Sequence, residues 1–409
     1  MNITESIILA IDSIRVNKLR AFLTLLSVAI GVFAIIGTGT LTSSLEGTMT
    51  KELEKIGETT FWIKKMPNIV TGNDWRKYSK RKPITYSQVK AFKRKMSITD
   101  QISAFGVSQG KTIKYGNEST NPDVTLFGTD EMYFPINAVN VVNGRPIMKQ
   151  DIALHRSVAV IGNDVAIKLF TNEAPLNKKI TIGNHSYTVI GVLEEKGGVL
   201  GQNKDNQVML PITNFLNYYA NHWEQSLTIS VKAPSRKLID ATIDETIGTL
   251  RILRKCKPWE ENNFELYTNE AISEMFGGFI SFLSAIGWIT GGFALIAAGV
   301  GIMNIMLVSV KERTREIGIR KAIGARKSWI MLQFIVETIT LVQIGGIVGI
   351  MLGIAGASLL GVFIGITPVF PIYWIIASVV ICGIMGVAFG SYPAWKAANL
   401  NPIDALHYE

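Results

Sequence analysis

Four long apolar runs constrain this chain more than any other feature. An α-helix needs about 20 residues to cross a bilayer, and each run reaches that length. Only 18% of the chain is charged, against about 25% in an ordinary soluble protein. Helices buried in a large soluble core are the alternative, but such lengths almost free of charge favour membrane spans. The predicted spans are residues 21–41, 279–310, 329–364 and 373–392.

The short loops between the spans predict their orientation, because positive charge in such loops marks the cytoplasmic side. The connector between the second and third spans, residues 311–327, is rich in Lys and Arg, whereas the loop ITPVFP after the third span has no charge. Basic residues also precede the first span: Arg15, Lys18 and Arg20. The protein is therefore predicted to lie in the cell's plasma (inner) membrane, with both termini and the connector on the cytoplasmic side. Residues 42–278 are predicted to lie outside, since long domains translocate largely regardless of charge.

Residues 1–20 and 393–409 flank the spans. Isoleucines recur at helical spacing through the first segment, at Ile3, Ile7, Ile11 and Ile14. We expect an amphipathic cytoplasmic helix here, lying either on the inner leaflet or against the spans. The first span is interpreted as an uncleaved anchor, because it exceeds the apolar core of a signal peptide, about 7–15 residues. Residues 393–409 are expected to form a cytoplasmic tail.

The insert, residues 42–278, is large enough for one or two domains. Apolar stripes at its ends predict that the first and second spans continue outward as a two-helix stalk. Runs rich in β-branched residues predict strands at 157–162, 179–183, 187–193 and 227–233, and apolar spacing predicts a helix over 240–253. The predicted fold class is a membrane α-helical protein with four transmembrane helices. A large α+β extracytoplasmic domain is inserted between the first and second spans.

The sequence lacks the common ATP-binding and metal-protease signatures. The nearest approach to the ATP-binding pattern G-x-x-x-x-G-K-[ST] is Gly110-Lys111-Thr112, but Phe105 stands where the first glycine belongs. H-E-x-x-H is missing. The four histidines have no metal-ligand spacing. The chain is predicted to be non-catalytic, with no cofactor and no metal of its own.

The basic clusters at 77–82 and 93–95, in a chain of net charge +9, raise the question of an anionic partner. Nucleic acid is not an expected partner, because both clusters lie in the insert outside the membrane. Lipid headgroups or an acidic protein would suit them. A solvated loop face is the simpler alternative.

Within the predicted spans, Glu337 is the one carboxylate. An intramembrane charge suggests a function, but this one lies only about 12 Å along the helix from its cytoplasmic end. Pairing with basic residues there is the structural alternative, and both stay open. Small residues let helices pack closely in lipid, within the chain or between two copies. The predicted packing positions are Gly345, Gly349, Gly353, Gly361, Gly365 and Gly386.

The connector region SVKERTREIGIRKAIGARKSWI holds apolar residues and glycines among its charges. Glu316 precedes Arg320 by four residues, the favourable order for a helical ion pair. Gly318 and Gly324 weaken or break a helix, and Ser328 is placed to cap the next one. We predict that the connector is a short basic helix parallel to the membrane. Charge that only orients the spans would not need these apolar and glycine positions.

The segment VKERTREIGIRKAIGARKSWIMLQFIVE resembles the signature of ABC-transporter permeases of the MacB/FtsX superfamily, V-x-E-R-T-R-E-I-G-I-R-K-A-[IL]-G-A followed by Q-F-x-x-E. The tail SYPAWKAANLNPIDALHYE is similar to the family's ending, with His407 where Arg is common. NKLRAFLTLLSVAIGV resembles the family's first span, and the segment from VNGRPI to VLEEKG resembles its extracytoplasmic core domain. The resemblance covers nearly the whole chain and is looser over 64–140.

The resemblance implies a permease that works with an ATPase, which binds ATP and Mg²⁺, either as a homodimer or as a pseudo-symmetric dimer with a related permease. The connector would be the coupling helix that docks on the ATPase. When the ATPase binds ATP, its movement would shift the spans and change the shape of the outer domain. Substrate would not need to cross the spans, a mode called mechanotransmission. MacB carries an ATPase domain before its first span; here Met1 lies shortly before that span, so a separate ATPase subunit is expected. The implied coupling residues are Glu312, Arg313, Thr314, Arg315, Glu316, Ile317, Gly318, Ile319, Arg320, Lys321, Gly324 and Ala325.

The implied function is export of peptides, antibiotics or lipid-like substrates, with release of lipoproteins as an alternative. A membrane-anchored sensor, whose connector docks a cytoplasmic partner other than an ATPase, is a second class of function. Membrane lipids are expected partners. A periplasmic adaptor and an outer-membrane channel are further candidates.

Overall fold

The computed structural model describes residues 18–67, 74–171, 173–199, 202–220, 226–402 and 405. The chain divides into two compact units. The first holds residues up to 48 and from 276 onward, and the second holds residues 49–275. The predicted amphipathic helix over 1–20 lies outside the described residues, except for Lys18 to Arg20, which begin the first helix of the structure.

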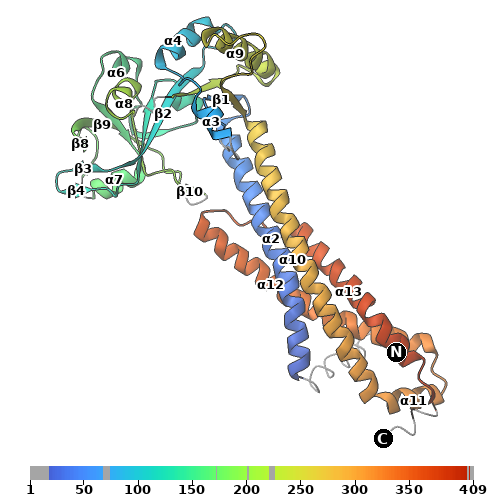
Figure 1. Ribbon diagram of the computed structural model, residues 1–409. Coiled ribbons are helices and arrows are strands. Elements are labelled where there is room, and N and C mark those ends of the chain that lie inside the picture. Colours follow the sequence, from blue (N-terminus) through green and yellow to red (C-terminus); the bar gives the residue numbers. More distant parts are fainter. Residues whose placement is uncertain are drawn as a thin grey trace. The chain divides into compact units, whose positions relative to one another are not determined.

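The first unit consists of long apolar helices and one short one (Figure 1). They are α2 (Lys18–Ile56), α10 (Asn269–Glu312), α11 (Thr314–Ala322), α12 (Lys327–Ile364) and α13 (Ile372–Ala398). Among the described residues, all but α11 are long and apolar enough to cross a membrane. Four such helices, with an α+β domain between the first and second, confirm the predicted fold class. As expected of stalk helices, α2 and α10 both extend beyond the predicted spans.

Glycines set the spacing of the long helices. Gly345, Gly349 and Gly353 of α12 face α2, and a Cβ atom built on Gly349 would lie 2.6 Å from the carbonyl oxygen of Ala29. Gly386 of α13 faces α12, where a Cβ atom would lie 2.8 Å from the Cα atom of Ile339. Such distances leave no room for a side chain, so the missing side chains let the helix backbones approach closely.

Gly365 has a different role from the packing role predicted for it. It is the C-cap of α12 and adopts φ +76°, a left-handed conformation that glycine takes without strain. The nearest neighbour of a Cβ atom built on Gly361 would be the carbonyl oxygen of Ile366 at 3.4 Å, so this glycine borders the same turn. Both residues therefore belong to the end of the third candidate span.

The second unit is built on one large mixed sheet with the strand order β14-β1-β13-β2-β5-β12-β7-β9-β8-β3-β4, and β6 pairs with β9. Most neighbours are antiparallel, but β12 pairs with β5, and β7 with β9, in parallel. A separate hairpin joins β10 (Gly198–Val199) and β11 (Gln202–Asn203). The strands of the large sheet are β1 (Thr60–Lys64), β2 (Ile102–Lys111), β3 (Ile113–Tyr115), β4 (Glu118–Ser119), β5 (Val124–Thr129), β6 (Val141–Gly144), β7 (Val158–Ile161), β8 (Lys179–Ile182), β9 (His185–Leu193), β12 (Gln207–Pro211), β13 (Thr228–Lys232) and β14 (Glu265–Thr268).

Short helices cover parts of this sheet. They are α3 (Trp75–Ser79), α4 (Tyr86–Lys95), α5 (Tyr133–Ile136), α6 (Lys149–Ala153), α7 (Asn163–Leu169), α8 (Ile212–Tyr218) and α9 (Ile239–Leu253). Thr85 and Gln88 form a capping box that begins α4. Phe215 of α8 packs over Gly106 and Gly128, where any side chain would collide with its ring. The four strands predicted from β-branched runs and the helix predicted over 240–253 are confirmed as β7, β8, β9, β13 and α9.

Candidate functional site

The connector is a short helix between two sharp breaks. Helix α10 ends at Glu312, Arg313 has non-helical angles, and α11 follows as a helix of 9 residues. The second break contains Gly324 at φ +98°. The N-cap of α12 is Arg326, with extended backbone angles, so the prediction that Ser328 caps this helix is wrong: Ser328 lies inside it. The helix is shorter than the predicted range of 311–327, since that range begins in the last two residues of α10 and ends in the second break and the first residue of α12.

One face of the connector is buried against the rest of the first unit. Thr314 donates a hydrogen bond from its hydroxyl to the carbonyl oxygen of Val310, at 3.0 Å, and Ile317 is buried. A Cβ atom built on Gly318 would lie 2.7 Å from the Cβ atom of Ala405 in the C-terminal tail. A larger residue at 318 would therefore push the tail away.

Two lysines also hold the tail against the connector. The Lys321 ammonium donates to the carbonyl oxygen of Leu400 at 2.7 Å, and the Lys327 ammonium donates to Asn399 Oδ1 at 3.1 Å. Burial, and secondarily the neighbouring charge of Lys327, lower the pKa of Lys321. The likeness of the tail to a family ending gave no sign of this contact, because no local pattern shows which segment a tail packs against.

Two arginines tie the connector to α12. Arg320 donates to Gln333 Oε1 at 3.0 Å and, in the described part of the chain, forms no ion pair with Glu316, although the sequence predicted one. Arg313 donates to Glu337 Oε1 at 3.4 Å. The Glu337 side chain is only 1% exposed. The structure thus favours the pairing alternative for Glu337, whose carboxylate fixes the start of the connector helix on the third candidate span.

The opposite face of the connector is exposed and mixes charge with apolar area. Glu312, Arg315 and Glu316 are exposed, and Ile319 and Ile323 are 44% and 81% exposed. Ala325 continues this surface. An exposed isoleucine among opposite charges is typical of a protein–protein contact, where apolar anchors are surrounded by polar residues. We call this surface the outer face of the connector; it is formed by Glu312, Arg315, Glu316, Ile319, Ile323 and Ala325.

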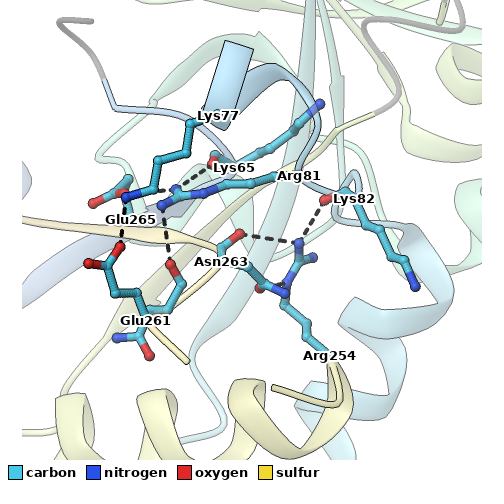
Figure 2. A network of polar contacts seen from close by, with 9 residues as sticks. Lys65, Lys77, Arg81, Lys82, Arg254, Glu261, Asn263 and Glu265 are labelled. Atoms are coloured by element: carbon cyan, nitrogen blue, oxygen red, sulfur yellow. Dashed lines mark hydrogen bonds and ion pairs between the residues drawn. The ribbon is translucent and has the colours of Figure 1, made fainter. Parts of the chain in front are cut away.

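Part of the basic cluster at 77–82 forms contacts within the second unit (Figure 2). Arg81 pairs with Glu265 at 2.7 Å and donates to the carbonyl oxygen of Lys65 at 3.0 Å. Lys77 pairs with Glu261 at 2.8 Å, and this hydrogen bond and the ammonium charge lower the pKa of Glu261. In the second cluster, Lys93 pairs with buried Asp130. For Lys77, Arg81 and Lys93, these contacts favour a structural role over an anionic partner.

Comparisons with known proteins match both parts of the chain. Residues 21–247 match the model of the MacB-like periplasmic core domain, and residues 288–402 match that of the FtsX-like permease C-terminal domain. The macrolide export ATP-binding/permease protein MacB of Bdellovibrio bacteriovorus is 31% identical over 404 residues, which cover 97% of this chain and 61% of that protein. This chain thus spans less than two thirds of that relative.

A second relative and a solved structure also match this chain. The ABC transporter permease YknZ of Bacillus subtilis is 28% identical over 414 residues and is covered in full, as is this chain. Among solved structures, the periplasmic region of MacB from Actinobacillus actinomycetemcomitans is 19% identical with a TM-score of 0.45. That match covers 56% of this chain and 98% of that one.

Proposed function

This chain belongs to the MacB/FtsX superfamily of ABC transporter permeases, and we propose that it couples ATP hydrolysis by an ABC ATPase subunit to a change in its inserted domain. The observation that carries the proposal is the outer face of the connector. It presents isoleucines and charges to solvent while Arg313 and Arg320 hold its other side on α12. A firmly held helix with an exposed apolar surface is suited to receive force from a partner.

The orientation follows from the charge of the connector. The basic connector and both termini then lie on the cytoplasmic side of the plasma (inner) membrane. The outer face of the connector is therefore on the side where ATP is available. The inserted domain then lies on the far side. The ATPase, and not the described residues of this chain, would bind ATP and Mg²⁺.

Mechanotransmission suits these helices better than conduction. Helices α2 and α10 each run without a break beyond the predicted spans, so a shift at the connector end of α10 can be carried along it. The predicted spans hold a single carboxylate, Glu337, and it is paired with Arg313. A polar pathway for ions or protons would require more such groups.

The substrate class and the wider assembly belong to the same proposal. Export of peptides, antibiotics or lipid-like molecules is the leading function, and one relative is a macrolide exporter by name. Lipoprotein release is the alternative within this class. A homodimer, or a dimer with a related permease, would present two connectors to two ATPase subunits. An adaptor and an outer-membrane channel are further candidate partners.

The double substitution Glu312→Ala with Arg315→Ala tests the proposal. Both side chains are exposed, so the protein should fold normally while its stimulation of ATP hydrolysis by the co-purified ATPase falls about tenfold or more. Lys237→Ala with Asp240→Ala removes the same two charge types from exposed positions of the second unit and serves as the control. Full stimulation by the connector double variant would favour the sensor alternative, in which no ATPase docks there.

A further inference from the structure

The second unit contains a cleft of about 920 Å³, and neither the connector nor the basic clusters contribute to its lining. Its floor is one cross-strand row of the large sheet, in which Val107 of β2 lies opposite Phe127 of β5, and Phe127 lies opposite Met209 of β12. These strands are neighbours in the sheet. The volume lies within the range of small-molecule sites, about 300–1,000 Å³.

One wall of the cleft is held in a strained conformation. Ala138 adopts φ +49°, which is unfavourable for a residue with a side chain. The ammonium of Lys196 donates to the Ala138 carbonyl oxygen at 2.7 Å, and Trp62 Nε1 donates to Asn137 Oδ1 at 3.1 Å. Backbone strain that neighbours hold in place is a feature of binding sites.

Another part of the lining comes from the end of α2. Glu52 of this helix forms an ion pair with Lys204, which follows β11, and both side chains line the cleft. The helix that contains the first candidate span therefore contributes directly to the cleft.

Tyr133 of α5 lines the cleft with an unused hydrogen-bonding group. The residue is 7% exposed, and its ring packs edge to face on Phe105, with centroids 5.1 Å apart. Its hydroxyl makes no hydrogen bond to any residue that the structure describes. Since hydroxyl groups on buried side chains are normally hydrogen-bonded, a polar group that enters the cleft would complete this site.

The charges of the cleft favour an uncharged ligand. Its lining holds two carboxylates, Glu52 and Asp123, and two ammonium groups, Lys196 and Lys204, so the formal charges cancel. The remaining polar side chains are mainly carboxamides, which donate and accept hydrogen bonds: Gln109, Asn137, Asn203, Asn206 and Gln207. Because the net formal charge of the lining is zero, it offers a charged ligand of either sign no overall electrostatic attraction to offset the hydration that the ligand loses.

From this geometry we infer that the cleft is a binding site for an uncharged amphiphile with an aromatic or aliphatic body and amide or hydroxyl groups. The body lies on Val107, Phe127 and Met209. Its polar groups bond to the Tyr133 hydroxyl and to the carboxamides of the rim. The site depends only on the second unit, so it stands or falls independently of ATPase docking.

Photolabelling of the full chain in lipid nanodiscs tests the inference. The probe is the N-acetyl amide of para-benzoylphenylalanine, an uncharged aromatic molecule with two amide groups. Peptide mapping by mass spectrometry should place saturable labelling on β2, β5, β12 and α5. The free amine and the free carboxylate of the same probe should label about tenfold less.

Two variants locate the probe in the cleft. Tyr133→Phe removes only the unused hydroxyl and should lower labelling at low probe concentration about fivefold. Tyr218→Phe, at an exposed tyrosine outside the cleft, should leave labelling unchanged. Gln109→Trp, at the exposed rim, should block entry and abolish labelling. Unchanged labelling in both cleft variants, or labelling confined to the spans, would overturn the site. Equal or stronger labelling by a charged probe would overturn the ligand class.

Discussion

Replacement of Ile323 by aspartate is expected to abolish association with the ATPase while leaving the permease folded. Ile323 is the C-cap residue of α11 and is 81% exposed. In a docked complex this side chain would be an apolar anchor, and such anchors contribute about 2 kcal/mol or more. A buried, unpaired carboxylate adds a desolvation cost. Affinity should therefore fall more than about thirtyfold.

The measurement is co-purification of the ATPase with detergent-solubilised permease. Ile252→Asp is the matched control, because Ile252 is 67% exposed on α9 of the second unit. Ile323→Lys separates an effect on docking from an effect on folding. A cation is favourable at the C-terminal end of a helix and an anion is not, whereas either charge at position 323 should prevent docking. Normal association of the ATPase with Ile323→Asp would show that the outer face of the connector is not the contact.

Replacement of Arg313 by methionine is expected to destabilise the first unit by about 3–5 kcal/mol, the usual cost of removing one partner of a buried ion pair. The change removes a cation that lies 3.4 Å from a carboxylate whose side chain is 1% exposed, and a buried charge that loses an ion-pair partner is strongly destabilising. Replacing both Arg313 and Glu337 by methionine should recover most of the loss, because apolar pairs often replace buried ion pairs without cost. Thermal unfolding in detergent measures both effects.

Arg320→Met is the control for this pair. It removes a hydrogen bond to the neutral Gln333 side chain, so its cost should be smaller, about 1–2 kcal/mol. If the double variant were as unstable as Arg313→Met, or if Arg313→Met were no worse than Arg320→Met, the Arg313–Glu337 pair would not be the support of the connector.

Local patterns in the sequence predicted the elements of this fold well. The long apolar runs became α2, α10, α12 and α13, because a helix is the structure that satisfies its own backbone in a membrane. Runs of β-branched residues form β7, β8, β9 and β13, because β-branched side chains pack well on a pleated sheet. The basic connector was also recognised, since its charges and glycines lie in one short stretch.

Contacts between distant segments could not be predicted in this way. The parallel pairing of β5 with β12 and the cross-strand row through Phe127 depend on the order of the sheet, which no periodicity records. The packing of Gly318 against Ala405 likewise joins residues far apart in the chain. Ser328 misled the prediction because the backbone already turns at Arg326, one residue before α12 begins.

The central claim is that the outer face of the connector contacts an ABC ATPase. Site-specific photo-crosslinking in cells tests it most directly, with a photoreactive benzophenone residue at the exposed Arg315 position and, as control, at Ile252. Captured proteins are identified by mass spectrometry. The account predicts that position 315 captures a protein with the P-loop motif and that position 252 does not. Capture of only partners without that motif, or equal capture at both positions, would contradict it.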